Sequence, residues 1–383
     1  MPDQHYSTMA QGIAENIKRG IASLSTAAAM KTPLNNLYHL ADANLMHFFP
    51  ALGTAQRRAI IAEVFWQQNM AMGDYTRHTL IDTTKVVDLA GALGSGGAPH
   101  IYCLYHVGSY RHFFHFLARE NIDCALFIAG KTLELQGQGI RDGENKAWGG
   151  RLDMIDAEAG NSLLRGARAL KRGQSVAIYI DGNSGSGANW ENNRLQAVEF
   201  FGKTLLARTG IAYLSHLSGV PIVPVTCKRG MTGPLSLTMH PPIKPDGAAR
   251  DAYVCDATRA LYALLEREIA DSPGLWEGWL YVQKYLQSRP QMEERILPQR
   301  ELGADTLIKA NLDEFAVLDF GGKPMLLDKQ RHSCSMLDEP TAEVFRNAAQ
   351  SATVPGADAI APGVRHLFEI GALVAAQECA GGR

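Results

Sequence analysis

The sequence has few cysteines and no long apolar run. Its six cysteines are scattered over 383 residues without a C-x-x-C pair, so we expect neither a disulfide framework nor a zinc knuckle, but a reducing compartment. No stretch approaches the roughly 18 consecutive apolar residues of a transmembrane helix, and the N-terminal MPDQHYSTMAQG lacks a signal-peptide layout. We therefore expect a cytoplasmic protein with at most peripheral contact with an inner membrane.

The chain also lacks an excess of charge of either sign. Its formal net charge of −2 argues against a general nucleic-acid binder, which would need a basic surface. Hydrophobic residues make up 46% and charged residues 20% of the sequence, which is the composition of a globular protein with a large core.

Residues 98–245 alternate between strand and helix patterns. Strands are predicted at 100–105, 123–129, 175–180, 221–226 and 235–239, and helices at 109–120, 160–172 and 206–218. Strands separated by helices indicate an α/β fold with a mostly parallel central sheet flanked by helices.

The regions that flank this α/β pattern have a different character. We predict a helical N-terminal region packed on the α/β domain, then a linker and a small α+β accessory module, which contains a hairpin over 315–327 and helices at about 339–350 and 361–378. The predicted ranges are 1–90 for the helical region, 91–290 for the α/β domain, 291–310 for the linker and 311–383 for the module.

His106 stands at the end of the most apolar strand. The run Ile101–Tyr105 precedes it, and Val107-Gly108-Ser109 forms a turn after it. Ligands bind at the carboxyl edge of open α/β sheets, and an imidazole placed there can take a proton near neutral pH. The alternative is a capping or hydrogen-bonded core histidine.

Asp181 occupies the same kind of position on another strand. It follows the apolar run Val176–Ile180 and opens a glycine-rich loop that begins Gly182-Asn183. Its carboxylate can accept a hydrogen bond from a histidine N–H and so fix the tautomer of the ring. The alternative is an aspartate that starts an Asx turn.

Several motifs occur in the order and spacing of a known enzyme family. They are His106–Arg111 after a strand, Ile178–Asp181 at a strand end, Val198–Gly202 with its Phe-Phe-Gly, Ser218–Pro224, and Pro273 with Trp276 and Trp279. Residues 35–285 resemble the bacterial lipid A biosynthesis acyltransferases, which are part of the lysophospholipid acyltransferase superfamily. The resemblance implies transfer of an acyl group from a thioester, on acyl carrier protein or CoA, to a hydroxyl or amine.

In this resemblance His106 is the general base and no cofactor is bound, since the thioester is a substrate. No nucleophile elbow G-x-S-x-G occurs, so we expect a ternary complex in place of an acyl-enzyme. Two alternatives stay open: a hydrolase in which water replaces the acceptor, and a non-catalytic binding protein for acyl carriers or peptides on a degenerate site.

The sequence departs from the family at Arg111, where the family has the acid that orients its histidine. We expect Asp181 to supply that carboxylate. Arg111 itself is expected to lower the pKa of His106 and keep the imidazole neutral. It is also expected to bind a phosphate or carboxylate of a substrate, or to polarise the thioester carbonyl.

Other substrate contacts are predicted from position alone. The candidates are Arg151, Arg165 and Lys203 for phosphopantetheine or a head group, with Ser109, Gly182 and Asn183 beside the proposed pair. A metal site is not expected, because His112 and His115 lie among phenylalanines without carboxylates at ligand spacing. The module at 311–378 resembles the small peptide-binding domain of the pyrroloquinoline-quinone chaperone type, which implies a peptide or carrier-protein partner.

Overall fold

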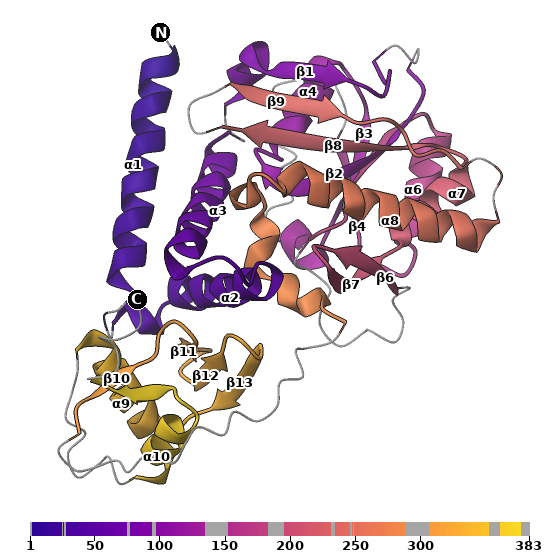
Figure 1. Cartoon of the computed structure of the whole chain (residues 1–383). Helices are drawn as coiled ribbons and strands as arrows, with labels where there is room; N and C mark the ends of the chain where they lie inside the picture. Colours follow the sequence, from indigo (N-terminus) through magenta and orange to yellow (C-terminus); the bar gives the residue numbers. More distant parts are fainter. Residues whose placement is uncertain are drawn as a thin grey trace. The chain divides into compact units, whose positions relative to one another are not determined.

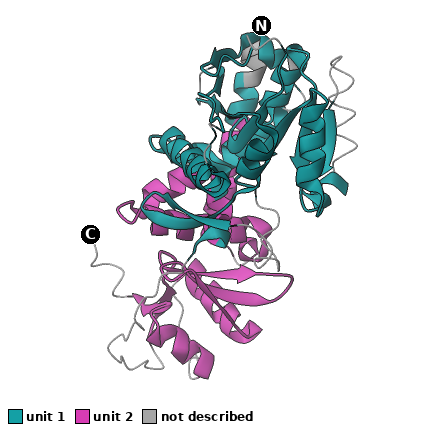
Figure 2. Ribbon diagram, turned by 90° about the vertical axis from the view of Figure 1, so that its right-hand side faces the viewer, with its two compact units in different colours: residues 1–11, 63–278, 284–287 teal, residues 12–62, 279–283, 288–383 magenta. Residues whose placement is uncertain are grey.

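The computed structural model forms two compact units (Figure 2). Unit 1 comprises residues 1–11, 63–278 and 284–287, and unit 2 comprises residues 12–62, 279–283 and 288–383. These boundaries differ from the predicted domain ranges, because residues 12–62 group with the C-terminal module. The residues described are 2–24, 26, 28–74, 77–93, 97–134, 152–182, 195–230, 234–245, 247, 249–287, 306–351 and 361–376.

Unit 1 is built on a seven-stranded sheet with the order β1-β9-β8-β2-β5-β3-β4 (Figure 1). Its strands are β1 (Lys85–Asp88), β2 (Ile101–Gly108), β3 (Cys124–Ile128), β4 (Leu152–Asp156), β5 (Ser175–Tyr179), β8 (Ile222–Arg229) and β9 (Leu235–Met239). All neighbours are parallel except β8 and β9. The predicted α/β class with a mostly parallel sheet is confirmed, although β1 and β4 were not predicted as strands.

The described helices are divided between the two units. They are α1 (Pro2–Ser23), α2 (Pro33–Phe48), α3 (Thr54–Asp74), α4 (His112–Arg119), α6 (Ser162–Lys171), α7 (Gly210–Ser218), α8 (Arg250–Ile269), α9 (Glu339–Gln350) and α10 (Pro362–Glu369). Of these, α1 and α3 contribute residues to both units. Short 3-10 turns are η1 (Ala29–Lys31), η2 (His78–Thr83), η3 (Pro273–Leu275), η4 (Glu277–Leu280) and η5 (Val282–Tyr285). Among the described helices, none is long and apolar enough to cross a bilayer.

The central strand β2 is buried on both faces, which explains its almost continuous apolar sequence. Because side chains alternate along a strand, Tyr102 and Tyr105 point to opposite faces. Tyr102 packs edge-on against Phe113 of α4, with 4.9 Å between ring centres, while the Tyr105 hydroxyl donates to the Leu261 carbonyl of α8 at 3.0 Å. Helices α4 and α8 therefore cover opposite faces of the sheet.

A two-stranded hairpin, β6 (Leu195–Phe200) and β7 (Lys203–Arg208), packs against α8. Its turn is made by Phe201 and Gly202, which both have positive φ, as a tight hairpin turn requires. The Phe-Phe-Gly motif thus encodes the turn. The predicted helix at 206–218 is wrong over 206–208, because the β7 residues pair with β6 and the helix begins only at Gly210.

Unit 2 contains two small sheets and helices from both ends of the chain. β11 (Phe315–Asp319), β12 (Pro324–Asp328) and β13 (Ser333–Met336) form an antiparallel sheet, and β10 (Ile308–Ala310) pairs with β14 (Leu373–Ala375). The predicted hairpin and the helix at 339–350 are confirmed. The predicted helix at 361–378 ends at Glu369 and is followed by a strand. The linker was expected at 291–310, but residues 308–310 form the strand β10. Residues 288–305 lie outside the described residues.

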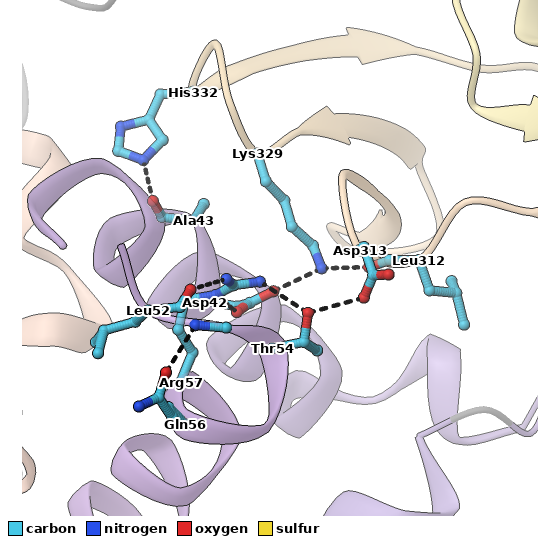
Figure 3. A network of polar contacts seen from close by, with 11 residues as sticks. Asp42, Ala43, Leu52, Thr54, Gln56, Arg57, Leu312, Asp313, Lys329 and His332 are labelled. Atoms are coloured by element: carbon cyan, nitrogen blue, oxygen red, sulfur yellow. Dashed lines mark hydrogen bonds and ion pairs between the residues drawn. The ribbon is translucent and has the colours of Figure 1, made fainter. Parts of the chain in front are cut away.

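The C-terminal module shares a core and a buried polar network with α2. Ala43 packs with Leu318 and Leu327 of the module. Asp42 of α2 accepts from Arg57 Nε at 2.6 Å and from Lys329 Nζ at 2.7 Å, and all three side chains are almost fully buried (Figure 3). Segments almost 290 residues apart therefore form one cooperative part of unit 2.

Candidate active site

His106 and Asp181 lie side by side at the carboxyl edge of the sheet: His106 is in β2, and Asp181 follows the end of the neighbouring strand β5. His106 Nδ1 and Asp181 Oδ1 are 2.8 Å apart. The imidazole is 18% exposed, whereas the carboxylate is only 2% exposed. Because the carboxylate accepts from Nδ1–H, Nε2 is the unprotonated nitrogen of the neutral ring and is left to act on a substrate.

The second oxygen of Asp181 is held by two further donors. The main-chain N–H of His106 donates to Oδ2 at 2.9 Å, and the indole Nε1–H of Trp276 donates to the same oxygen at 2.8 Å. A buried carboxylate is costly unless it is hydrogen-bonded. The three donors satisfy the buried carboxylate of Asp181 and fix its orientation.

Trp276 is itself held firmly in place. Its ring packs edge-on against Phe200 of the hairpin, with 5.2 Å between ring centres, and its main chain forms an antiparallel bridge with Val107. A Cβ on Gly278 would stand 2.1 Å from the indole ring, so only glycine leaves room for it there. Phe200 and Gly278 thereby position the indole that holds Asp181.

Two tyrosines and a glycine surround the imidazole. Tyr179 lies 4.6 Å from the His106 ring and Tyr110 lies 4.7 Å from it, between ring centres. A Cβ on Gly182 would lie 3.7 Å from His106 Cε1, so this residue borders the ring. The Gly182 carbonyl in turn accepts a hydrogen bond from the Tyr285 hydroxyl. The walls beside His106 are therefore mostly aromatic.

The electrostatics of His106 correct one expectation. Burial lowers the pKa of the imidazole, but the adjacent Asp181 carboxylate and its hydrogen bond, with help from Glu277, outweigh burial and the Arg111 charge. The pKa of His106 is raised above its ordinary value. Arg111 lowers this pKa, as predicted, but it does not decide the net shift, because the carboxylate in direct contact with the ring acts more strongly.

Ser109 does not face the substrate side. It is fully buried, and its hydroxyl donates to Asp74, which also pairs with Arg229 of β8. The described residues thus give Ser109 a partner in the core, and its predicted substrate contact stays a prediction. Gly108, just before it, has a φ of +57°, and a Cβ there would lie 2.5 Å from the Cys227 carbonyl oxygen. Glycine at position 108 therefore allows the end of β2 to pair closely with β8.

The other predicted contacts fall in different places. Arg165 is exposed on α6 and donates to the Met154 carbonyl in β4, which β3 and β5 separate from β2. Lys203 begins β7 at the hairpin turn, and no contact joins it to the His106–Asp181 pair within the described part of the chain. Arg151 and Asn183 lie outside the described residues. His112 and His115 are buried, and His112 bonds the Thr84 hydroxyl at 2.8 Å.

Sequence reasoning missed the supporting residues of the pair. In the sequence, Trp276 appears only as part of a Pro-x-x-Trp-x-x-Trp element. Tyr179 was visible only as a strand residue two positions before Asp181, and Tyr110 only as an aromatic after the turn. The indole–carboxylate contact joins positions 95 residues apart, so no local pattern could have indicated it.

Comparisons with known proteins gave a match to one family model and matches to solved structures. The model of the bacterial lipid A biosynthesis acyltransferase family matches residues 149–287, which include Asp181, the hairpin and Trp276. The resemblance stated from the sequence is thus confirmed, and the match supports an acyltransferase. A solved structure, the 1-acyl-sn-glycerophosphate (LPA) acyltransferase PlsC from Thermotoga maritima, matches at 11% identity and a TM-score of 0.33, covering 70% of this chain and 99% of that one. No match was found among curated proteins.

Proposed function

We propose that the protein transfers an acyl group from an acyl thioester, on acyl carrier protein or CoA, to a hydroxyl or amine acceptor. The observation that carries the proposal is the 2.8 Å contact between His106 Nδ1 and a buried carboxylate, in a chain that matches an acyltransferase family. The arrangement is that of a general base with its orienting acid, in which the family's acid at position 111 is replaced by Asp181 from another strand.

In the proposed reaction, Nε2 of His106 accepts the proton of the acceptor O–H or N–H as the acceptor attacks the thioester carbonyl carbon. The tetrahedral adduct then collapses, the C–S bond breaks, and the imidazolium returns the proton to the thiolate. Asp181 holds the ring and stabilises its charged form between these steps. The histidine ends as it began, and no cofactor takes part.

The test is mass spectrometry of the purified protein with a panel of acyl-CoA and acyl-carrier thioesters, with and without hydroxyl and amine acceptors. Wild type is compared with His106→Ala and Asp181→Asn. Acyl products whose formation needs both residues support the proposal. Loss of thioester to free acid in every arm identifies the hydrolase alternative. Thioester binding that is unchanged by His106→Ala, without turnover, identifies the binding protein.

We also propose that unit 2 binds an extended peptide, either free or as part of a carrier protein. The supporting observation is β13, which forms the edge of its sheet and has four exposed residues in a row. The Leu337 N–H bonds the Pro324 carbonyl, so by antiparallel alternation the main-chain groups of Met336 point outward from the ladder. An exposed edge of this kind pairs with an added strand.

Met336→Pro removes an outward N–H and leaves the inner ladder intact. Loss of binding to a library of extended peptides, with unchanged thermal unfolding, is the expected result. Equal peptide binding by wild type and Met336→Pro would contradict an edge-strand site.

A further inference from the structure

The side chains of Arg111, Tyr110 and Glu277 form a hydrogen-bonded chain beside the proposed catalytic pair. The Tyr110 hydroxyl donates to Glu277 Oε2 at 3.1 Å and accepts a hydrogen bond from the Arg111 guanidinium. The guanidinium carbon lies 5.5 Å from the centre of the Tyr110 ring. Burial and the Glu277 carboxylate raise the pKa of Tyr110, so the hydroxyl keeps the proton that it donates.

The ring of Tyr110 is the part of this chain that reaches His106. Its centre lies 4.7 Å from that of the imidazole and 5.6 Å from that of Tyr179, which itself lies 4.6 Å from the imidazole. The three rings thus pack against one another. Asp181 holds the imidazole at one atom, Nδ1, which leaves the ring able to tilt about that contact. The packed rings limit this tilt and so fix the direction of Nε2.

Tyr110 depends on its side-chain contacts because it lies in the turn between β2 and α4, outside the sheet. Glu277 follows Trp276, whose main chain bridges Val107 of β2. The hydrogen bond from Tyr110 to Glu277 therefore ties the turn to a segment that is already attached to the sheet. Trp276 holds Asp181 and Glu277 holds Tyr110, so two consecutive residues support two of the groups that contact the imidazole.

We propose that Glu277 and Arg111 are positioning residues, which hold the Tyr110 ring against His106 so that Nε2 keeps the direction needed to take a proton from the acceptor. The inference rests on the proposed function and adds a second support for the base to the one that Asp181 supplies. Arg111, which stands where the family has its orienting acid, here acts through the Tyr110 hydroxyl. A misdirected base slows proton transfer and leaves substrate binding intact.

The first experiment measures the imidazole without turnover. The pH titration of His106 is followed by NMR, with His106→Ala to assign its signal, and variants are compared by the chemical shift of the neutral imidazole, on the plateau above the pKa. The ring current of Tyr110 contributes to this shift. Tyr110→Phe removes the hydroxyl and keeps the ring, and Glu277→Ala removes the acceptor. We expect both to move the plateau toward its value in the unfolded chain, and the double variant to move it no further.

Glu277→Gln separates positioning from charge. Its amide oxygen can still accept from Tyr110, so the plateau should stay close to the wild-type value while the pKa of His106 falls, because the carboxylate charge is lost. Arg111→Met removes the donor to the hydroxyl and should move the plateau as Tyr110→Phe does. The matched control is Tyr102→Phe, which removes a buried hydroxyl from the strand that carries His106 and should leave the plateau unchanged.

The contrary results are equally specific. Charge alone accounts for Glu277 if Glu277→Ala lowers the pKa of His106 while the plateau, in this variant and in Tyr110→Phe, stays at the wild-type value. A plateau that Tyr102→Phe moves as far as Tyr110→Phe would indicate a general loosening of the core. A wild-type plateau in Arg111→Met removes Arg111 from the proposed role.

The second experiment measures the consequence for acyl transfer by steady-state kinetics. Tyr110→Phe and Glu277→Ala should each lower kcat about tenfold with KM changed less than about twofold. The double variant should also lose about tenfold and not about a hundredfold, because both changes act through one hydroxyl. Additive losses in kcat, or losses confined to KM, overturn the proposal. Absence of thioester consumption by wild type refutes the proposed function, while the NMR comparison still decides whether Tyr110 is held against His106.

Discussion

The indole N–H of Trp276 and the carboxylate of Asp181 form a 2.8 Å hydrogen bond inside the core of unit 1. Through this bond the Pro-x-x-Trp element near the end of the α/β region reaches the acid that holds His106. Trp276 acts on the imidazole through Asp181, so we regard it as a positioning residue.

Trp276→Phe should lower kcat roughly tenfold with little change in KM, because it removes one hydrogen bond of about 1–2 kcal/mol from the carboxylate. Trp279→Phe is the matched control, since it removes another buried indole from the same motif. Steady-state kinetics on both variants provide the measurement. Equal losses in the two variants would indicate a general packing defect.

Asp181→Asn should lower kcat by about 10²–10⁴ while preserving the fold. The amide NH₂ can donate to Nδ1 of the ring, which favours the tautomer with the proton on Nε2, and that nitrogen then cannot accept a proton. The variant is assayed beside Asp181→Ala, with circular dichroism to verify folding. Activity near wild type in Asp181→Asn would remove the carboxylate from the mechanism.

The pH profile of kcat/KM should rise with pH and level off above the pKa of His106. A base must be neutral to act, and Asp181 raises this pKa above the ordinary 6.5. Glu277→Gln should move the rising limb to lower pH and Arg111→Gln to higher pH, since Glu277 raises the pKa of His106 and Arg111 lowers it. A rising limb centred below 6.5 in wild type would contradict the role assigned to the pair.

The same pKa shift makes a prediction for stability. Because the pKa of His106 is higher in the folded than in the unfolded chain, the imidazolium stabilises the fold fully below about pH 6.5. This contribution is lost as the pH rises through the folded pKa. Urea unfolding of wild type and His106→Asn at several pH values should therefore give a difference in unfolding free energy that shrinks as the pH rises. A difference in unfolding free energy that stays constant with pH would contradict a raised pKa of His106 in the folded chain.

The buried network around Asp42 should control the stability of unit 2. Asp42→Ala leaves Arg57 and Lys329 buried without their shared carboxylate and should cost about 3–5 kcal/mol. Lys31→Met removes an exposed ion pair with Glu339 at 3.0 Å and should cost less than about 1 kcal/mol. Denaturant unfolding of the two variants measures the contrast. Similar small costs in both would show that the network contributes little.

The sequence by itself determined the strands β2, β3, β5, β8 and β9 of the central sheet, the edge at which ligands bind and the two residues that meet there. Each of β2 and β5 is short and apolar with a polar residue near its carboxyl end, and parallel neighbours place such ends together. His106 and Asp181 could therefore be predicted from separate motifs. The helix of residues 339–350 and the hairpin of residues 315–327 could also be predicted, because residues within each segment specify its caps and turns.

Only the tertiary structure decided which groups support that pair and which stay buried. Trp276 reaches Asp181 from 95 residues away, and the Ser109 hydroxyl donates to Asp74 at the end of α3. The raised pKa of His106 depends on a contact distance that no spacing encodes, and residues 12–62 group with the C-terminal module through Asp42 and Lys329. Such relations between distant segments arise from packing, which local periodicity does not record.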